Sequence, residues 1–435
     1  MALAPHEDNS TVRDVLVIGG GPAGSTIAAL LAARGKAVTL VDKDRHPRFH
    51  IGESLLPFNL PLFDKLGVRE EIERVGMPKF GIEFVSPHHE KPSLFEFGDG
   101  WHKEMNYAFQ VRRSVFDHIL LKNAAKNGAE VIEACRVTDV DFPPEGGAVA
   151  SATAEDGTKR LWRARFLVDA TGRDTFLAAR LKLKQRNRRH ESAAIFGHFT
   201  NAERLRGRAE GNISILWFDN GWFWFIPLSD GTTSVGAVCP PDVIKNRDGD
   251  VTSFFKTLIE RCPALADRLR NATLTGPATA TGNYSYSSDR MIGDRYIMVG
   301  DASAFIDPVF STGVYLAMHS GFLGADAVVA CLDHPERADK TLKHFERDVR
   351  KGLDRFSWFI YRITSPAIRS LFMEPGNPFR VGEAVLALLA GDIAAKSPIR
   401  FRLALFKAIY YAKMLSASAN KFLGRPLAAV PRPRS

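Results

Sequence analysis

Residues 14–42, DVLVIGGGPAGSTIAALLAARGKAVTLVD, constrain the fold more than any other segment of the chain. The short β-branched run at residues 15–18 suits a buried parallel strand. Glycines follow it at spacing G-x-G-x-x-G, and an alanine- and leucine-rich stretch then predicts a helix over residues 25–34. Residues 38–41 predict a second strand. This order of strand, glycines, helix and strand predicts the first unit of a parallel α/β sheet that binds a dinucleotide.

Each part of this segment has a mechanical role in such a site. The backbone at Gly19, Gly21, Ala23 and Gly24 can approach a pyrophosphate at the N-terminus of the helix. Asp42 lies eighteen residues beyond Gly24, at the end of the second strand, where a carboxylate can accept a hydrogen bond from a ribose hydroxyl. A glycine-rich turn without a ligand is the weaker alternative.

Two later segments distinguish between dinucleotides. Residues 166–172 read FLVDATG, and residues 296–302 read YIMVGDA; each is an apolar strand that ends in a tight turn. Together with the glycine pattern they resemble the FAD-binding domain of the glutathione reductase type, especially its aromatic hydroxylase branch. The resemblance implies one FAD, with Gly300 and Asp301 near its ribityl or phosphate region and Arg113 as an additional contact. A second dinucleotide fingerprint is absent from the sequence, so a dedicated nicotinamide domain is not expected.

A tryptophan motif narrows the branch. Residues 221–228, GWFWFIPL, contain W-x-W-x-I-P as Trp222, Trp224, Ile226 and Pro227. Two residues spaced two apart in a strand face the same side, which in isolation is typical of a core aromatic ladder. The motif nevertheless uses two of only six tryptophans, and it resembles the signature of flavin-dependent halogenases. In that family the two indoles are thought to line the flavin face and to keep organic substrate away from the oxygen-activated flavin.

Three further positions carry the same resemblance. Residues 52–57, GESLLP, are similar to a halogenase segment and imply that Ser54 lies beside the cofactor. Lys79, in MPKFGIEF, is similar to the essential lysine of the family, although a solvated lysine is the ordinary alternative. Thr312 and Gly313, in DPVFSTGVYL, correspond to the backbone that holds chloride in halogenases.

Phe310 departs from the tryptophan halogenases, which usually carry glutamate at that position to serve their substrate. The resemblance therefore favours the branch that acts on phenols, pyrroles or carrier-tethered acyl groups.

The predicted fold class is α/β: a glutathione-reductase-type FAD-binding fold with an inserted mixed-sheet substrate domain and a helical C-terminal region. We assign residues 1–80, 106–185 and 285–335 to the FAD-binding domain, and residues 81–105 and 186–284 to the substrate-side sheet. Residues 336–435 show apolar residues at helical spacing, interrupted by prolines, and predict the helical region.

Composition sets the remaining limits. The 435 residues are 45% hydrophobic and 25% charged, which excludes a disordered or fibrous chain. The four cysteines are scattered, so neither a metal site nor a disulfide framework is expected, and a cytoplasmic location fits. Glu7 and Asp8 occupy the place where a signal peptide would be basic. No uncharged apolar run reaches about 20 residues, so a spanning helix is not expected.

The net charge of +9 is concentrated near the C-terminus. Nine Lys and Arg residues and no Asp or Glu follow Asp392. These basic residues are Lys396, Arg400, Arg402, Lys407, Lys413, Lys421, Arg425, Arg432 and Arg434. A solvated face is the ordinary interpretation. The alternative is a docking surface for something acidic, such as a carrier protein or anionic lipid; no nucleic-acid-binding motif accompanies the charge.

These observations lead to one hypothesis and two rivals. As implied by the resemblance, a halogenase would use FAD reduced by a separate flavin reductase, oxygen, and chloride or bromide. Lys79 would then present the halogenating species to an electron-rich aromatic substrate, free or tethered to a carrier protein. Such enzymes belong to secondary metabolism and antibiotic biosynthesis. The rivals are an FAD-dependent monooxygenase or reductase of the same fold, and a flavin-binding scaffold without activity.

Overall fold

The computed structural model describes residues 7–187, 190–282, 285–393 and 397–422. Its first sheet is built around the buried strand predicted at residues 15–18, which begins earlier than expected, at Glu7. The strand order is β19-β20-β10-β1-β2-β7, and the β8–β9 hairpin extends the sheet beside β10. The strands that run parallel to one another are β1 (Glu7–Ile18), β2 (Val38–Val41), β7 (Glu130–Ile132), β10 (Lys159–Asp169) and β20 (Tyr296–Met298). The antiparallel additions are β8 (Cys135–Asp141), β9 (Ala148–Ala154) and β19 (Ile292–Gly293).

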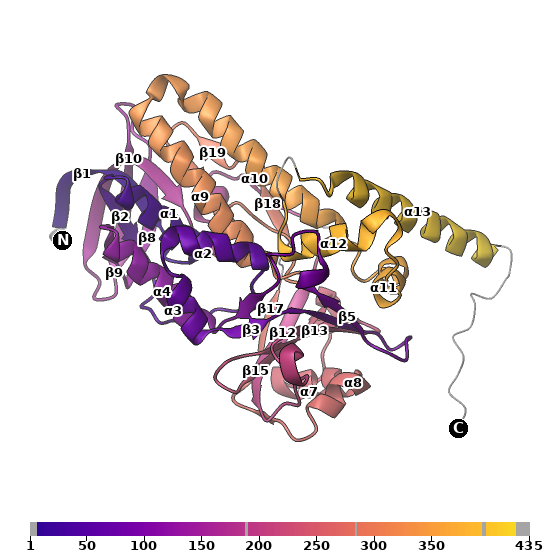
Figure 1. Cartoon of the computed structure of the whole chain (residues 1–435). Helices are drawn as coiled ribbons and strands as arrows, with labels where there is room; N and C mark the ends of the chain where they lie inside the picture. The colour runs from indigo at the N-terminus through magenta and orange to yellow at the C-terminus, as the bar shows by residue number, and fades with distance from the viewer. Residues whose placement is uncertain (1–6, 188–189, 283–284, 394–396, 423–435) are drawn as a thin grey trace.

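Helices pack against this sheet. Helix α1 follows β1 directly, with Gly21 at its N-cap and proline as its first residue, which suits a helix start. It contacts both α4 and α9, and in Figure 1 α9 and α10 form two long neighbouring helices beside α1. The bounds are α1 (Pro22–Ala33), α4 (Arg113–Lys126), α9 (Thr312–Asp333) and α10 (Ala338–Ile360). Shorter helices in this part are α2 (Leu60–Leu66), α3 (Arg69–Val75) and α5 (Phe176–Arg180).

Helix α9 is long and apolar enough, by length and composition, to cross a membrane. However, 61% of its most apolar window is buried within the protein. It packs between α1 and α10, which accounts for its apolar composition as a core helix.

The second sheet lies below the first in Figure 1 and has the order β16-β12-β15-β14-β13-β4-β5, with β17 beside β12. One face packs on α7 and α8, and the other face packs toward the first sheet and the C-terminal helices. Its strands are β4 (Gly81–Val85), β5 (Ser93–Glu96), β12 (Ala193–Thr200), β13 (Ile213–Phe218), β14 (Gly221–Pro227), β15 (Thr233–Cys239), β16 (Thr273–Leu274) and β17 (Thr279–Gly282). The helices are α6 (Pro241–Lys245), α7 (Val251–Glu260) and α8 (Pro263–Arg268).

Two small sheets connect the larger ones. The first pairs β3 (Met77–Lys79) with β6 (Ala108–Gln110), and the second joins β11 (Lys184–Arg186), β18 (Tyr286–Ser288) and β21 (Ala304–Phe305). Strands β4 and β5 belong to the second sheet although the chain reaches them before α4. The chain therefore passes between the two large sheets more than once. The domain boundaries assigned above remain a prediction.

The helical region predicted at residues 336–435 contains α10, which packs on α9, and also α11 (Pro366–Met373), α12 (Val381–Ala390) and α13 (Arg400–Phe422). Helix α13 packs on α11 and α12 and extends away from the rest of the molecule (Figure 1). Of the nine basic residues after Asp392, four lie outside the described residues: Lys396, Arg425, Arg432 and Arg434.

Candidate flavin and halogenation site

The glycine-rich turn between β1 and α1 is a close-packed backbone junction. A Cβ atom at Gly24 would lie 1.9 Å from the carbonyl oxygen of Gly19, so no side chain fits there. A Cβ at Gly21 would meet only the guanidinium of Arg48, at 3.6 Å. Gly24 is therefore needed for the fold itself, whereas the missing side chain of Gly21 leaves space in a cavity.

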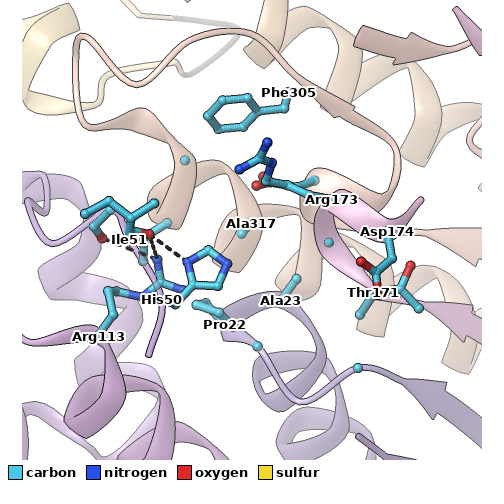
Figure 2. Close-up of a pocket in the computed structure, with 18 of the residues that line it drawn as sticks. Pro22, Ala23, His50, Ile51, Arg113, Thr171, Arg173, Asp174, Phe305 and Ala317 are labelled. Carbon is cyan, nitrogen blue, oxygen red and sulfur yellow. Dashed lines mark hydrogen bonds between the residues drawn. The ribbon is translucent and has the colours of Figure 1, made fainter. Parts of the chain in front are cut away.

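That cavity has a volume of about 580 Å³ and lies between the two large sheets. Gly19, Gly21 and Ala23 line it from the turn, and Asp42 lines it from the end of β2. In Figure 2 the turn at Pro22 and Ala23 lies on one side, and Phe305 lies across the cavity from it. The volume is typical of a site for a large organic cofactor.

Two predicted acidic contacts line the cavity. Asp42 is buried and accepts hydrogen bonds from the backbone N–H groups of Gly20 and Asp44, which fixes its carboxylate at the end of β2. Burial raises the pKa of Asp301 to about 6, while the cations Arg113 and Arg173 oppose that rise. Gly300, next to Asp301, does not line the cavity, and its N–H donates a hydrogen bond to Ser320 Oγ at 2.8 Å.

Arg113 also lines the cavity, but its guanidinium is already well bonded. It makes a bidentate ion pair with Asp117, one turn along α4, at 2.8 and 3.0 Å. It also donates to the carbonyl oxygens of Ile51, at 3.0 Å, and Gly52, at 3.3 Å. Figure 2 shows Arg113 and His50 both bonded to the Ile51 carbonyl. Arg113 therefore orders the segment before Ser54 as well as facing the cofactor site.

Among the lining residues that the sequence analysis did not predict are Arg48, His50 and Arg173. Arg48 and His50 directly precede the GESLLP segment, and Arg173 directly follows D-A-T-G, so proximity to those motifs was the available signal. Burial lowers the pKa of His50 to about 4, so its imidazole is neutral at ordinary pH. Arg173 donates to Thr281 Oγ1 and to the Gly282 carbonyl.

The tryptophan motif forms the far wall of the cavity. Trp222 and Trp224 lie on β14 with ring centroids 6.2 Å apart, and both line the cavity with Ile226. Trp224 donates its indole N–H to Ser234 Oγ at 3.2 Å. Gly236 on the neighbouring strand leaves room for this ring, because a Cβ there would lie 2.2 Å from it. Pro227 ends the strand and does not line the cavity.

Lys79 is fully buried at the end of β3. Its ammonium donates to Ser54 Oγ at 2.9 Å and to the Leu55 carbonyl at 3.1 Å, and it lies 5.3 Å from the centroid of the Phe97 ring. Burial lowers its pKa to about 7. Ser54 lines the cavity whereas Lys79 does not, so the lysine lies directly behind the cavity wall.

The predicted halide turn begins α9. Ser311 precedes the helix with a left-handed φ of +57°, and no side chain caps the first turn. Gly313 lines the large cavity. Together with Thr312 it also lines a second cavity of about 20 Å³. Free N–H groups at a helix N-terminus favour an anion.

These residues fit FAD. The space at Gly21 admits a pyrophosphate against backbone N–H groups, Asp42 can accept from a ribose, and the tryptophan wall offers an apolar surface to a planar ring. The structure thus brings the predicted glycine, acidic, arginine and tryptophan residues around one cavity. Thr312 and Lys79 lie just outside it, and so do Gly24, Gly300 and Pro227, which shape the wall.

Comparison with known proteins decides the family. A family model described as tryptophan halogenase matches residues 14–104 and 99–365. The chain belongs to this family of flavin-dependent halogenases. Tryptophan 2-halogenase of Chondromyces crocatus is 38% identical over 72% of this chain, and the match spans 60% of that relative's length. The chlorinase of 1H-pyrrole-2-carbonyl peptidyl-carrier protein from Pseudomonas fluorescens is 29% identical over 87% of this chain and 89% of its own.

Solved structures agree with this halogenase assignment. The myxobacterial chondrochloren halogenase CndH is 34% identical, with a TM-score of 0.78, and the match covers 89% of this chain and 92% of that one. The flavin-dependent brominase Bmp2 is 27% identical with a TM-score of 0.79, covering 93% and 100%. The predicted family, fold class, enzyme class and FAD cofactor are confirmed, and the names of the relatives support the use of a halide.

Proposed function

We propose that this halogenase uses reduced FAD, oxygen and chloride or bromide to halogenate an electron-rich aromatic substrate. The observation that carries the proposal is the position of Lys79. Its amine is bonded on one side to Ser54, which lines the flavin cavity, and faces the Phe97 ring on the other. A buried amine between a residue of the cavity wall and an aromatic ring is suited to act on a small species that leaves the cavity.

The residues of the chain divide the chemistry between them. FAD, when bound, supplies the reaction of oxygen with halide that yields an electrophilic halogen species. The N–H groups at Thr312 and Gly313 hold the halide at the edge of the cavity. With a pKa near 7, Lys79 is present as both ammonium and free amine at neutral pH, so it can donate a hydrogen bond to the halogen species or bind it.

Trp222 and Trp224 complete this division. Both indoles line the cavity and are packed into the core behind it, so they keep an organic substrate from the flavin. We also propose that a separate flavin reductase supplies the reduced FAD, since the sequence carries one dinucleotide fingerprint.

Lys79→Ala tests the proposal. With an added flavin reductase, FAD, oxygen and bromide, we expect the variant to oxidise reduced FAD at a normal rate. We expect it to lose at least about a hundredfold of its yield of brominated phenols and pyrroles. Lys343→Ala, on the exposed face of α10, serves as the control and should keep full yield.

The products distinguish the alternatives. Oxygenated product from the native enzyme would instead identify a monooxygenase. Brominated product at normal yield from Lys79→Ala would remove the lysine from the mechanism.

A second proposal concerns how the substrate arrives. Two relatives are named for substrates on a peptidyl-carrier protein, and α13 carries Arg400, Arg402, Lys407 and Lys413 with no acidic residue. This helix packs on α11 and α12, whereas Phe401 in its first turn is 74% exposed. The helix thus presents both charge and apolar surface to a partner, and we propose an acidic carrier protein.

Salt dependence tests this docking. Exposed charges are screened within about 8 Å at physiological ionic strength, so the turnover of a carrier-linked substrate should fall as salt rises. Turnover of the matching free acid should not fall. Reversing the charges of Arg400, Arg402 and Lys407 should reproduce the loss. Equal salt sensitivity of the two substrate forms would contradict carrier docking.

A further inference from the structure

Aromatic side chains form a continuous stripe across the inner face of the second sheet, leading away from the flavin cavity. Trp222, which lines the cavity, pairs across β13–β14 with Trp217. The Trp217 ring stacks on Phe84 of β4, with centroids 5.4 Å apart. Phe84 in turn lies 4.9 Å from Phe372 of α11. The stripe therefore connects the wall of the cofactor site to the C-terminal helices.

Helix α11 closes the far end of this stripe. Phe372 lies 5.9 Å from Phe95 of β5 and 6.4 Å from Phe310, the residue that precedes the halide turn. Helix α11 has only eight residues, and Ser365 caps it by accepting from the N–H of Ile368. Phe372 thus occupies the place where an aromatic ring could lie beside Phe310 and Phe84.

Arg369, one turn before Phe372 on the same helix, places a positive charge at this end of the stripe. Its guanidinium carbon lies 5.8 Å from the centroid of the Trp217 ring. Its Nε is buried and has no hydrogen-bond partner, and no ion pair to this guanidinium occurs among the described residues. Burial lowers the pKa of Arg369, and the attraction of Asp219 opposes that shift. By contrast, Arg362 donates to the Trp358 carbonyl and to Tyr411.

Other cations gather around Arg369. Lys413 of α13 donates to Ser370 at 2.6 Å, and the charges of Arg369 and Lys413 both lower the pKa of His89, in the loop between β4 and β5. His88 of the same loop also lowers the pKa of His89. The nearby acids are Asp219, which attracts Arg369 from an exposed turn, and Glu374, which raises the pKa of His89 more than any one of these cations lowers it. Neither of these acids pairs with Arg369, so this partly exposed guanidinium, whose Nε is buried without a partner, is left for an external anion.

We propose that Arg369 binds an anionic group of the aromatic substrate, a carboxylate or a phosphate, while the substrate ring packs on the aromatic stripe beside Phe372. This inference rests on the proposed halogenase function and specifies its substrate class. A planar guanidinium over an indole suits a carboxylate or phosphate, because it can donate two parallel hydrogen bonds without leaving the ring. The anion has two sources: a free aromatic acid, or the phosphate of a phosphopantetheine arm.

Binding to the FAD-loaded enzyme, measured by calorimetry without turnover, tests the site. The probes are 4-hydroxybenzoate and its neutral analogue 4-hydroxybenzamide, which match in shape. We expect the native enzyme to bind the acid about tenfold more tightly than the amide, and Arg369→Gln to abolish that preference. Arg369→Lys should restore part of it. Arg362→Gln, which changes an arginine whose guanidinium is already bonded to the Trp358 carbonyl and to Tyr411, should leave the preference unchanged.

Phosphopantetheine is the second probe. If the phosphate of a carrier arm is the anion, phosphopantetheine binds the native enzyme and loses about tenfold in Arg369→Gln, while the two benzoyl probes bind alike. An acid preference that depends on Arg369 identifies the free acid as the source. The proposed site is overturned if Arg369→Gln binds phosphopantetheine as tightly as the native enzyme does and also keeps the native preference for the acid over the amide. Because no turnover is measured, failure of the halogenase proposal would appear separately, in the Lys79→Ala experiment.

Discussion

The flavin cavity and the aromatic stripe adjoin at Trp222 on the inner face of the second sheet, and they differ in how they are filled. The cavity is open, holds about 580 Å³, and is lined by charged groups that are already fixed by hydrogen bonds, such as Asp42 and Arg113. The stripe is closed: Trp217, Phe84 and Phe372 are each at most 1% exposed and pack ring against ring.

The difference separates two ways of building a binding site. The cofactor side is preorganised, because its backbone junction and its ion pairs form without the ligand. The substrate side carries a fully buried lysine and a partly exposed arginine whose buried Nε has no hydrogen-bond partner, which is a costly arrangement unless a ligand compensates it. We therefore expect cofactor binding to leave the fold unchanged and substrate binding to displace Phe372.

Gly21→Val should give the largest effect and tests whether the cavity is preorganised. Gly21 has φ −73°, which any residue adopts, and its Cβ direction is nearly empty, so the apo fold should survive. The valine side chain would stand where the pyrophosphate meets the backbone, so FAD affinity should fall by at least about a hundredfold. Fluorescence titration measures the affinity, and circular dichroism measures the fold.

Gly24→Val is the contrasting variant. Its Cβ would meet the Gly19 carbonyl at 1.9 Å, so the protein should lose folded yield as well as FAD. Full FAD affinity in Gly21→Val would show that the cofactor lies elsewhere.

Phe372→Ala tests how tightly the stripe is packed. Removing a buried phenylalanine side chain costs about 3–5 kcal/mol of the free energy of unfolding, because a cavity remains. Phe49→Ala, at the rim of the flavin cavity, should cost less than about 1 kcal/mol because Phe49 is 59% exposed. Urea unfolding of the apo proteins measures both, and similar losses would mean that the two sides are equally packed.

The pH dependence of stability gives the smallest effect and tests the burial of Lys79. Below pH 7 the lysine binds a proton in both the folded and the unfolded state. Above pH 7 the folded state releases its proton first, since burial lowers the folded pKa to about 7 from 10.5, so folding stability rises with pH. Relative to Lys79→Met, the native protein should gain about 2 kcal/mol between pH 7 and pH 9.

Urea unfolding of both proteins at each pH measures this difference. A constant difference between the two proteins would place Lys79 in contact with water or with an acid.

The sequence determined the features that depend on local spacing. The strand–glycine–helix segment at residues 14–42 predicted β1, α1, β2 and the cofactor side, because G-x-G-x-x-G constrains the backbone wherever it occurs. Trp222 and Trp224 were expected on one face from their spacing, and they share one wall. The family resemblance included residues 52–57 and Lys79. It did not predict that Ser54 would accept a hydrogen bond from the Lys79 amine.

Tertiary structure alone decided what those residues meet. Arg369, Lys413 and His89 come from α11, α13 and the β4–β5 loop, and no spacing in the sequence relates them. Phe372 closes the aromatic stripe because α11 packs back over β4, almost three hundred residues away along the chain. Local sequence fixes backbone geometry and the face on which a side chain lies. Desolvation and charge pairing depend on long-range packing, so the buried lysine and the unpaired arginine emerge only in the folded chain.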